Sequence, residues 1–436
     1  MRVNFTELLD KAKWGKPHWR LFTVVSLNYL LDGIMFSIAP LVTALVAPQM
    51  YYMIFPLNLI AEALGAILLG WLADRYGRRI MFMLAMSLEV VALILLFLLH
   101  GNIFALALLT SLMTFGIGGE FGAAYSAIAE LTPMKHRGKA LLLSTNFWNV
   151  GAALIAGLAL IYTAIYAEVD VEVKALLGSA LGTAIVVGIA RLAFPESPRW
   201  LVVKGRVGEA LKLVRSLTGF KGEVSFNLPK ESSISLSEAF RNYAYRLVVL
   251  AIITVAQYVT YGMEAYYAPY ASGFAFGLEV APLVIFIANL GASVGAFMLI
   301  PIIDRARRLS TFVSFMLGST TASLILIAHE VRLEQFFYIM LFVNLIFSEW
   351  AWGSLSVLQS ELFPTGVRAS VVGFLTSLTG VSGALVMYFE ALITATQFLL
   401  LATVIWFIGF LAAFSWYFRG IESAGRSVEE LIMRNE

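Results

Sequence analysis

Twelve long apolar stretches constrain the fold of this chain more than any other feature of its sequence. A helix needs about 20 mainly apolar residues to cross a bilayer, and each stretch is about that long. Most of them show no alternation of polar and apolar residues, which disfavours the strands of a membrane β-barrel. The sequence therefore predicts an all-α membrane protein with twelve transmembrane helices, near residues 20–46, 50–72, 80–100, 103–129, 140–166, 174–194, 246–270, 281–303, 310–328, 335–359, 369–392 and 397–418.

The composition agrees with this prediction, because 60% of the 436 residues are hydrophobic and only 13% are charged. Soluble domains carry about 25% charged residues, so the excess apolar surface is expected to face lipid. A net charge of +2 indicates no nucleic-acid partner. The absence of cysteine excludes disulfides, thiolate metal sites and a cysteine nucleophile. No metal site and no cofactor are predicted.

The distribution of lysine and arginine predicts the orientation, since cytoplasmic loops of membrane proteins carry an excess of both. An even number of spans puts the two termini on one side of the membrane. That side is predicted to hold all of the 30 Lys and Arg residues except Lys174 and Arg332. We therefore expect a multi-pass protein of the cell membrane with both termini in the cytoplasm.

Two motifs recur at nearly the same offset along the chain. The pattern Glu-Leu-x-Pro-x-x-x-Arg begins at Glu130 and again at Glu361, and an Asp-Arg pair begins at Asp74 and again at Asp304. Two independent motifs with one offset make coincidence improbable. Parallel repeats of this kind occur in transporters, where they place the solute site near the membrane midplane between two halves.

The repeat predicts how the chain is divided. It matches Arg78 with Arg308, and it separates two pseudo-symmetric bundles of six helices each. The first bundle is predicted at 1–194 and the second, with a short cytoplasmic tail, at 246–436. The only sizeable insertion, 195–245, is too short for an ordinary soluble domain, so it is interpreted as cytoplasmic linker helices.

Two segments carry a resemblance to a known family. The run Gly-Trp-Leu-Ala-Asp-Arg-Tyr-Gly-Arg-Arg at 70–79 resembles the loop signature of the major facilitator superfamily. Pro-Glu-Ser-Pro-Arg-Trp-Leu at 195–201 resembles the segment after the sixth helix of the sugar porter group and its organic-ion relatives. The resemblance extends over nearly the whole chain. It implies the fold of that superfamily and a secondary transporter that works by alternating access. A monomer is expected, although the sequence leaves the oligomeric state open.

Other positions depart from the sugar porters. Thr145 stands where they usually carry a glutamine, Ser356 stands at their sugar-stacking tryptophan, and Thr110 stands at a common arginine. The resemblance therefore does not support hexose specificity. Asp32 followed by Gly33 is more similar to relatives that move organic acids or other metabolites with protons.

The resemblance also implies a gate built from charged residues of the short loops. The loop at Asp74 would brace two helices in one state and release them in the other, with solvated loop charges as the alternative interpretation. One ion pair is expected within each loop: Glu130 with Arg137, Glu361 with Arg368, and Glu196 with Arg199. The predicted gating residues are Asp74, Arg75, Arg78, Glu130, Arg137, Glu196, Arg199, Asp304, Arg308, Glu361 and Arg368.

Five carboxylates lie near the middle of the predicted spans, and a sixth, Glu264, lies closer to the outer end of its span. A charge at the bilayer centre costs about 3 kcal/mol or more, so each needs a partner, a proton or a water-filled cavity. Arg191 is expected near the inner end of its helix, which leaves no cation at their depth. Asp32, Glu120, Glu349 and Glu264 are predicted to couple transport to protons, in that order of preference. Glu62 and Glu89 are interpreted as protonated carboxyls between packed helices.

Polar and aromatic side chains gather where a midplane site would lie. Amides and aromatic faces suit a neutral polyhydroxyl or ring-bearing solute, although any one of them alone is more often a packing residue. The predicted solute-binding residues are Asn28, Tyr125, Asn146, Trp148, Asn149, Gln257, Tyr261, Asn289, Asn344 and Trp352.

The leading functional prediction is proton-coupled symport of a small polar organic solute, such as a sugar or a related metabolite. An organic-cation or drug/proton antiporter is the alternative of the same class, and a non-transporting membrane sensor is the alternative of another class. No P-loop motif occurs, so an ATPase motor is not expected. The midplane carboxylates lie on separate helices without a visible nucleophile, so no enzyme is predicted. The identity of the solute, the direction of transport and the choice between protons and sodium remain open.

Overall fold

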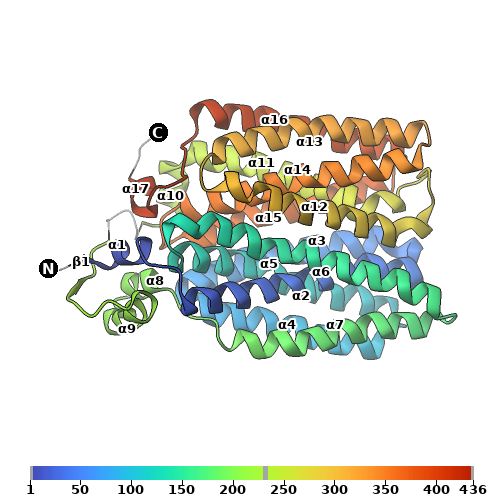
Figure 1. The fold of residues 1–436 in the computed structure, drawn as a ribbon. Helices are drawn as coiled ribbons and strands as arrows, with labels where there is room; N and C mark the ends of the chain where they lie inside the picture. The colour runs from blue at the N-terminus through green and yellow to red at the C-terminus, as the bar shows by residue number, and fades with distance from the viewer. Residues whose placement is uncertain (1–2, 229–233, 434–436) are drawn as a thin grey trace.

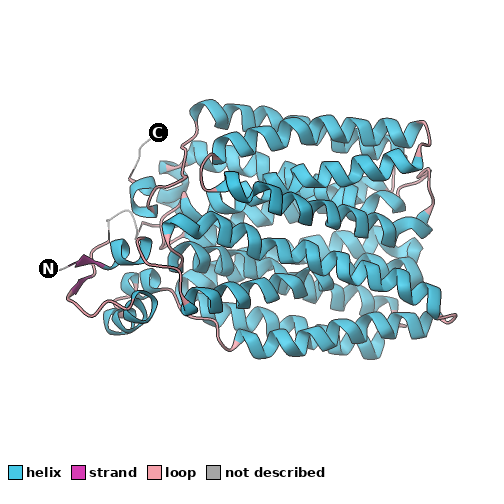
Figure 2. Ribbon diagram, viewed as in Figure 1, coloured by secondary structure: helices cyan, strands magenta, loops and turns pink. Residues whose placement is uncertain are grey.

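The computed structural model describes residues 3–228 and 234–433, which are almost entirely helical (Figure 1, Figure 2). Within this described part, twelve helices are long and apolar enough to cross a membrane. The prediction of an all-α membrane protein with twelve spans is confirmed. The six spanning helices of the first half are α2 (Lys16–Val46), α3 (Tyr51–Tyr76), α4 (Arg78–Leu99), α5 (Ile103–Leu131), α6 (Arg137–Ile165) and α7 (Val169–Arg191).

The second half repeats this arrangement. Its spanning helices are α11 (Ala244–Gly262), α12 (Ala281–Ile303), α13 (Arg307–Glu330), α14 (Glu334–Glu361), α15 (Arg368–Glu390) and α16 (Ala395–Arg419). In Figure 1 the first half forms the lower layer and the second half the upper layer, with all helices roughly parallel. The halves pack together chiefly through α3 against α15 and through α6 against α12.

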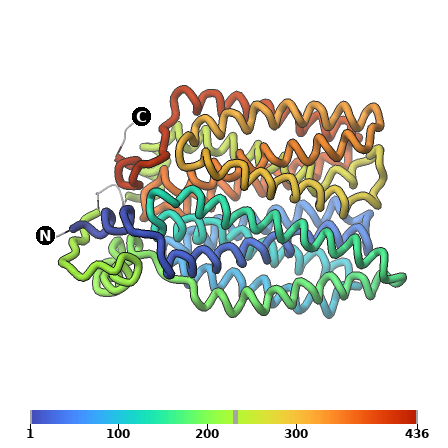
Figure 3. Tube along the Cα trace, in the orientation of Figure 1, coloured from blue at the N-terminus to red at the C-terminus, as the bar shows by residue number. Residues whose placement is uncertain are grey.

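The two short strands and the short α-helices collect at the end of the bundle that carries both termini, which we name the termini end (Figure 3). The other is the far end. The strands β1 (Val3–Asn4) and β2 (Val224–Ser225) pair in parallel at the termini end, so the N-terminal segment is attached to the linker. The short helices are α1 (Phe5–Asp10), α8 (Pro198–Val203), α9 (Val207–Thr218), α10 (Leu236–Asn242) and α17 (Val428–Ile432). The predicted linker helices are thus α8 to α10, and residues 229–233 of the predicted linker lie outside the described residues.

The seventh span departs from a plain helix. After Gly262 the chain continues as a π-helical turn, Met263–Tyr267, and then as a 3-10 turn, Ala268–Tyr270. Turns of this type are frequent at functional sites. At its end the Tyr270 hydroxyl donates a 2.5 Å hydrogen bond to the carbonyl of Pro40 in α2, so the turn ties the second half to the first near the far end.

Small residues set how closely the spanning helices approach. A Cβ atom added to Gly33 in α2 would lie 2.0 Å from the carbonyl oxygen of Trp148 in α6, and one added to Gly151 in α6 would lie 2.0 Å from the carbonyl oxygen of Leu30. The two backbones therefore touch on both sides of the crossing, as small residues allow in membrane bundles. This crossing carries Trp148 to the centre of the molecule.

Candidate functional site

A cavity lies at the centre of the bundle between the two halves. The first half contributes α2, α5 and α6, and the second contributes α11, α12 and α14. The empty volume among the lining side chains is about 440 Å³, most of it in gaps too narrow for a water molecule. The cavity is therefore nearly filled in this conformation. Its lining residues are Tyr29, Phe121, Thr145, Trp148, Asn149, Gln257, Tyr258, Tyr261, Ala292, Glu349 and Trp352.

Hydrogen bonds across the half interface fix the polar part of the wall. The Asn149 side chain in α6 donates to Glu349 in α14 over 2.8 Å. The indole N–H of Trp148 in α6 donates to the Tyr261 hydroxyl in α11 over 3.1 Å. Because these partners lie on opposite halves, the wall of the cavity must rearrange whenever the halves move apart.

The structure places five predicted solute-binding residues in this wall and five outside it. Those in the wall are Trp148, Asn149, Gln257, Tyr261 and Trp352. Three others lie directly behind it: Tyr125 contacts the rings of Phe121 and Trp352, Asn146 donates to Ser293, and Asn289 accepts from Tyr261.

The other two lie elsewhere. Asn344 donates to the Gly318 carbonyl and to Thr321 on the neighbouring helix α13, so its predicted contact with solute is wrong and it is a packing residue. Asn28 belongs to a separate cluster of acidic side chains.

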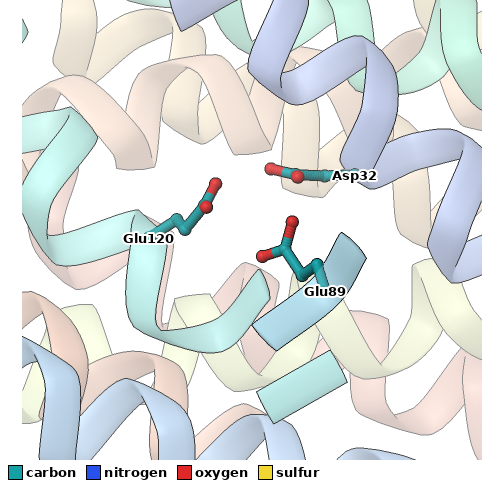
Figure 4. A group of neighbouring side chains, drawn as sticks. All are labelled: Asp32, Glu89 and Glu120. Atoms are coloured by element: carbon teal, nitrogen blue, oxygen red, sulfur yellow. The ribbon is translucent and has the colours of Figure 1, made fainter. Parts of the chain in front are cut away.

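Three carboxylates form that cluster beside the cavity. Asp32 of α2, Glu89 of α4 and Glu120 of α5 each place a carboxylate oxygen within 4.8 Å of the others. Figure 4 shows the three groups pointing toward one another, and all three are at most 1% exposed. The Asn28 amide donates to Asp32 over 2.8 Å and also to Glu120, so it joins two of the acids.

Among the described residues, one arginine lies against this cluster. The Arg191 guanidinium contacts both oxygens of Glu120, at 2.5 and 2.7 Å, and lies 3.9 Å from Glu89. It also donates to the Phe82 carbonyl over 2.8 Å and covers that ring. The prediction that no cation lies at the depth of the carboxylates is therefore wrong. Arg191 ends α7, but its long side chain extends back into the bundle.

The remaining carboxylates have separate surroundings. Glu89 is buried between packed helices, as predicted, and it also belongs to the cluster, which the sequence did not predict. Glu62 of α3 accepts a hydrogen bond from Tyr258 of α11, which links it to the cavity wall. Glu349 lies in the cavity wall itself. Glu264 accepts a hydrogen bond from the Trp406 indole on α16 over 3.3 Å, and it belongs neither to the cluster nor to the cavity wall.

Ion pairs join the two halves at the termini end. In each pair the acid belongs to one half and the arginine to the other. Arg368 contacts Glu130 at 2.6 Å, and Arg137 approaches Glu361 at 3.6 Å. The predicted pairs within each loop are therefore wrong. The loop that follows α5 packs against the loop that follows α14. The glutamate of each loop therefore lies closer to the arginine of the other loop than to the arginine of its own. Arg137 also contacts Asp10 at 2.8 Å.

The two aspartates of the repeated motif also reach across the interface. Asp74 accepts from the backbone N–H and the hydroxyl of Ser370, over 2.8 and 2.7 Å, at the start of α15. Asp304 accepts from the backbone N–H of Gly138, over 3.0 Å, at the start of α6. Each aspartate thus supplies a carboxylate to a helix N-terminus of the other half, where the unpaired N–H groups and the helix dipole favour it.

The match of Arg78 with Arg308 is wrong by one residue. Arg78 contacts Asp74 at 3.1 Å, whereas in the second half Arg307 contacts Asp304 at 3.4 Å and also pairs with Glu361. The loop of the second half is one residue shorter, which shifts the equivalent arginine.

Two predicted gating arginines have other contacts. Arg308 donates to the Gly420 carbonyl over 2.9 Å. Arg75 is exposed and stacks on Trp71 and Tyr76, so it makes no contact with the other half in the described structure.

Glu196 and Arg199 do not pair with each other either. Glu196 accepts from the backbone N–H groups of Arg78 and Arg79, over 3.1 and 3.3 Å, and burial raises its pKa. Arg199 contacts Asp10 at 3.0 Å and Glu429 at 2.9 Å. This loop therefore ties the linker to both terminal segments.

Comparison with known proteins gives the family. The sequence matches the model described as "Sugar (and other) transporter" over residues 35–433. This chain belongs to that family. The transporter is 29% identical over 429 residues to the inner membrane metabolite transport protein YgcS of Escherichia coli, a match that covers 94% of this chain and 93% of that one.

Two further proteins extend the comparison. The transporter is 24% identical over 403 residues to the niacin transporter NiaP of Acinetobacter baylyi, covering 87% of this chain and 88% of that one. Its fold matches that of XylE from E. coli, the major facilitator superfamily proton:xylose symporter solved with 6-bromo-6-deoxy-D-glucose. The TM-score is 0.76 at 18% identity, over 95% of this chain and 98% of that one. The protein is thus a sugar or metabolite transporter of the cell membrane, with the major facilitator fold, and not an enzyme.

Five residues that line the cavity were not among the predicted solute-binding residues: Tyr29, Phe121, Thr145, Tyr258 and Ala292. Helix spacing could have found two of them. Thr145 lies three and four residues before Trp148 and Asn149, and Tyr258 lies three before Tyr261, so each shares a helix face with predicted residues. Phe121 and Ala292 carry no polar group within an apolar span, so no sequence signal distinguishes them from packing residues.

The repeat of the transporter extends to a third motif that sequence comparison missed. Glu422 accepts from the backbone N–H groups of Arg307 and Arg308, both over 3.2 Å, as Glu196 does from the equivalent pair in the first half. Both acids are followed by serine and come just after the last span of their half. The match is only two residues long, which is too short to identify without the structure.

Proposed function

We propose that the protein is a proton-coupled symporter that moves a small polar organic solute across the cell membrane by alternating access. The observation that carries the proposal is the buried cluster of Asp32, Glu89 and Glu120 with Arg191 as its single close cation. The cluster shares α2 and α5 with the cavity, since Asn28 and Glu120 directly precede the wall residues Tyr29 and Phe121.

Charge counting explains why such a cluster suits proton coupling. Three ionised carboxylates and one guanidinium would leave two uncompensated negative charges inside the bundle. A charge at that depth costs about 3 kcal/mol or more, and a bound proton removes it. The cluster is therefore expected to hold protons while the site is closed and to exchange them when one end opens to water.

The contacts at the two ends support alternating access. At the termini end, Asp74 and Glu130 hold the other half through Ser370 and Arg368. At the far end, aromatic contacts predominate, among them Phe55 against Tyr267 with ring centres 4.9 Å apart. Both sets join the two halves and would have to separate in turn.

The orientation and organisation are part of the same proposal. The positive-inside rule places the termini end in the cytoplasm, and the bundles at 1–194 and 246–436 move as units about the linker 195–245, within a monomer. The names of the relatives indicate xylose for XylE and niacin for NiaP. Both are small ring compounds, which agrees with a small organic solute.

Accumulation in proteoliposomes tests the proposal. Purified protein would be reconstituted and screened with labelled sugars, amines and ring carboxylates, with and without an inward proton gradient. We expect the gradient to drive accumulation of the transported solute by wild type. Asp32→Asn should retain exchange of solute but lose the response to the gradient. Asp170→Asn, an exposed acid at the far end, should behave as wild type. Gradient-driven accumulation by Asp32→Asn would contradict the coupling role of the cluster.

A further inference from the structure

The aromatic donors of the cavity wall already have partners within the protein. The indole N–H of Trp148 donates to the Tyr261 hydroxyl over 3.1 Å, and that hydroxyl donates to Asn289 over 2.7 Å. The Tyr258 hydroxyl donates to Glu62. A solute in the cavity therefore meets the faces of these rings, and their donor groups point elsewhere.

The amide and hydroxyl donors of the wall are also engaged. Asn149 donates to one oxygen of Glu349 over 2.8 Å. The side-chain nitrogen of Gln257 donates to the carbonyl and the hydroxyl of Ser348, over 3.3 and 3.1 Å. Because a carbonyl oxygen only accepts, this contact fixes which end of the Gln257 amide carries the nitrogen. The Thr145 hydroxyl donates to the backbone of its own helix.

Two acceptors in the wall, by contrast, remain without a donor. Oε1 of Glu349 and Oε1 of Gln257 are buried and have no hydrogen-bond partner within the described structure. The Tyr29 hydroxyl is also unpartnered, and it accepts as readily as it donates. A buried acceptor without a donor is destabilising. None of the described residues that line the cavity is a lysine or an arginine, so these acceptors are available to a ligand that carries hydrogen-bond donors.

Aromatic rings make up much of the remaining wall. An aromatic cage with a nearby acid is the usual chemistry for recognising an ammonium group, because the ring faces are electron-rich. The rings that surround this cavity are Tyr29, Phe121, Trp148, Tyr258, Tyr261 and Trp352.

We propose that the transported solute carries a protonated amine, which donates to Glu349 and Gln257 while its apolar part stacks on the aromatic wall. This inference rests on the proposed function, since it names the solute class for the same cavity. An anion would meet the Glu349 carboxylate without a compensating cation. A neutral polyol would satisfy the two acceptors, but its own hydroxyl oxygens would find almost no free donor in the wall.

Binding of three matched probes tests this inference. Phenethylamine, phenylethanol and phenylacetate share a ring and chain but end in an ammonium, a hydroxyl and a carboxylate. Their affinities for the purified protein would be measured by calorimetry in detergent at neutral pH. We expect the amine to bind about 10- to 100-fold more tightly than the alcohol, as a charge-assisted hydrogen bond provides, and the carboxylate to bind most weakly.

Variants of Glu349 identify the group responsible. Glu349→Gln should remove most of the preference for the amine while leaving the affinity for the alcohol nearly unchanged, and Glu349→Asp should restore part of it. Glu334→Gln, an exposed acid on the same helix, is the matched control and should keep the full preference. Equal or tighter binding of the alcohol or the carboxylate overturns the inference. So does a failure of the amine to bind, or a preference that persists in Glu349→Gln.

These measurements are independent of proton coupling. Binding in detergent needs no gradient, and Asp32→Asn should still prefer the amine. If the preference is present but gradients drive no accumulation, the coupling proposal fails and the solute class stands. If gradients drive accumulation of a neutral solute and the amine has no advantage, the solute class fails and the coupling proposal stands.

Discussion

The guanidinium of Arg191 supplies the positive charge that partly balances the buried acids. In the described structure Arg191 is the one basic side chain that pairs with acids of the cluster, and it contacts both oxygens of Glu120 and lies near Glu89. Replacing a buried ion pair by apolar groups is often tolerated, but removing only one partner leaves an uncompensated charge. The stability of the first half therefore depends on this arginine and its acids together, more than on either alone.

Arg191→Gln should lower the stability of the protein by about 3–5 kcal/mol. The double variant Arg191→Gln with Glu120→Gln should recover part of that loss, because it also removes the stranded carboxylate. Melting temperatures in detergent would measure both, with the exposed Arg305→Gln as a control that changes little. A double variant less stable than Arg191→Gln alone would show that the charge balance is not what holds the cluster.

At this scale the sequence predicts residue types better than partners. The acids within apolar spans are evident, because a buried charge is rare and conspicuous. Their partners are not, since Arg191 stands at the end of α7 and reaches Glu120 through the length of its side chain. Asn344 shows the converse: an amide at the expected depth turns out to face α13.

At the scale of elements, the crossing of α2 and α6 depends on two glycines. A side chain at Gly151 would collide with the carbonyl of Leu30, so the helices would have to separate. The same crossing positions Trp148 in the cavity. Packing and function therefore depend on one small residue at this point.

Gly151→Ala should destabilise the protein by about 1–3 kcal/mol or more, the usual range for overpacking. Gly182→Ala is the matched control, because a Cβ at Gly182 meets nothing within 4 Å. That control should be neutral or slightly stabilising, since alanine favours helix by up to about 1 kcal/mol. Melting temperatures of the two variants would measure this difference in stability. Equal stabilities would argue against backbone contact at the crossing.

The C-terminal helix α17 is attached by a pH-sensitive contact. Burial raises the pKa of Glu429, but the Arg199 guanidinium at 2.9 Å outweighs burial and holds that pKa below its usual range. A lowered pKa means that the ionised acid stabilises docking at neutral pH. That stabilisation should be lost as the pH falls below about 4.3, the ordinary value for glutamate.

A fluorophore on Met433→Cys can report this docking, because the chain has no cysteine of its own. Anisotropy of the label should stay high at neutral pH and fall in acid as α17 detaches. In the Glu429→Gln background it should be lower at neutral pH and vary little with pH. A wild-type signal that is constant down to pH values well under 4 would contradict the attachment through Arg199.

Elements were largely predictable, because about 20 apolar residues are what a bilayer requires. The predicted spans agree with α2 to α7 and α11 to α16 apart from shifts at their ends. The π-helical turn Met263–Tyr267 was not predicted, since it results from tertiary packing and its residues are ordinary for a helix. The pairing of Glu130 with Arg368 and of Glu361 with Arg137 was likewise not predictable. The repeated motif is equally consistent with pairs within each loop and with pairs between the loops.

At the scale of the whole molecule, closure of the termini end is two-fold symmetric. Asp74 holds the start of α15 and Asp304 holds the start of α6, each from the other half. Opening this end requires both contacts to break together. The repeat therefore explains why one loop signature occurs twice.

Asp74→Ala should shift the protein toward the state open at the termini end. It removes both hydrogen bonds from Ser370, and one bond to a charged group is worth about 1.5–3 kcal/mol. A cysteine introduced by Ser356→Cys, at a buried position of α14, should then react with thiol reagents about tenfold faster. Arg75→Gln, at an exposed position of the same loop, should not change the rate. Unchanged labelling in Asp74→Ala would show that Asp74 does not hold this end closed.

The most direct test of the account is the sign of proton movement during transport. Solute would be added outside proteoliposomes that start without a gradient and enclose a pH-sensitive dye. The account predicts acidification of the lumen with wild type and none with Asp32→Asn, while labelled solute still enters both. Entry of solute into wild-type vesicles without any pH change, or with alkalinisation, would contradict proton symport through the Asp32 cluster.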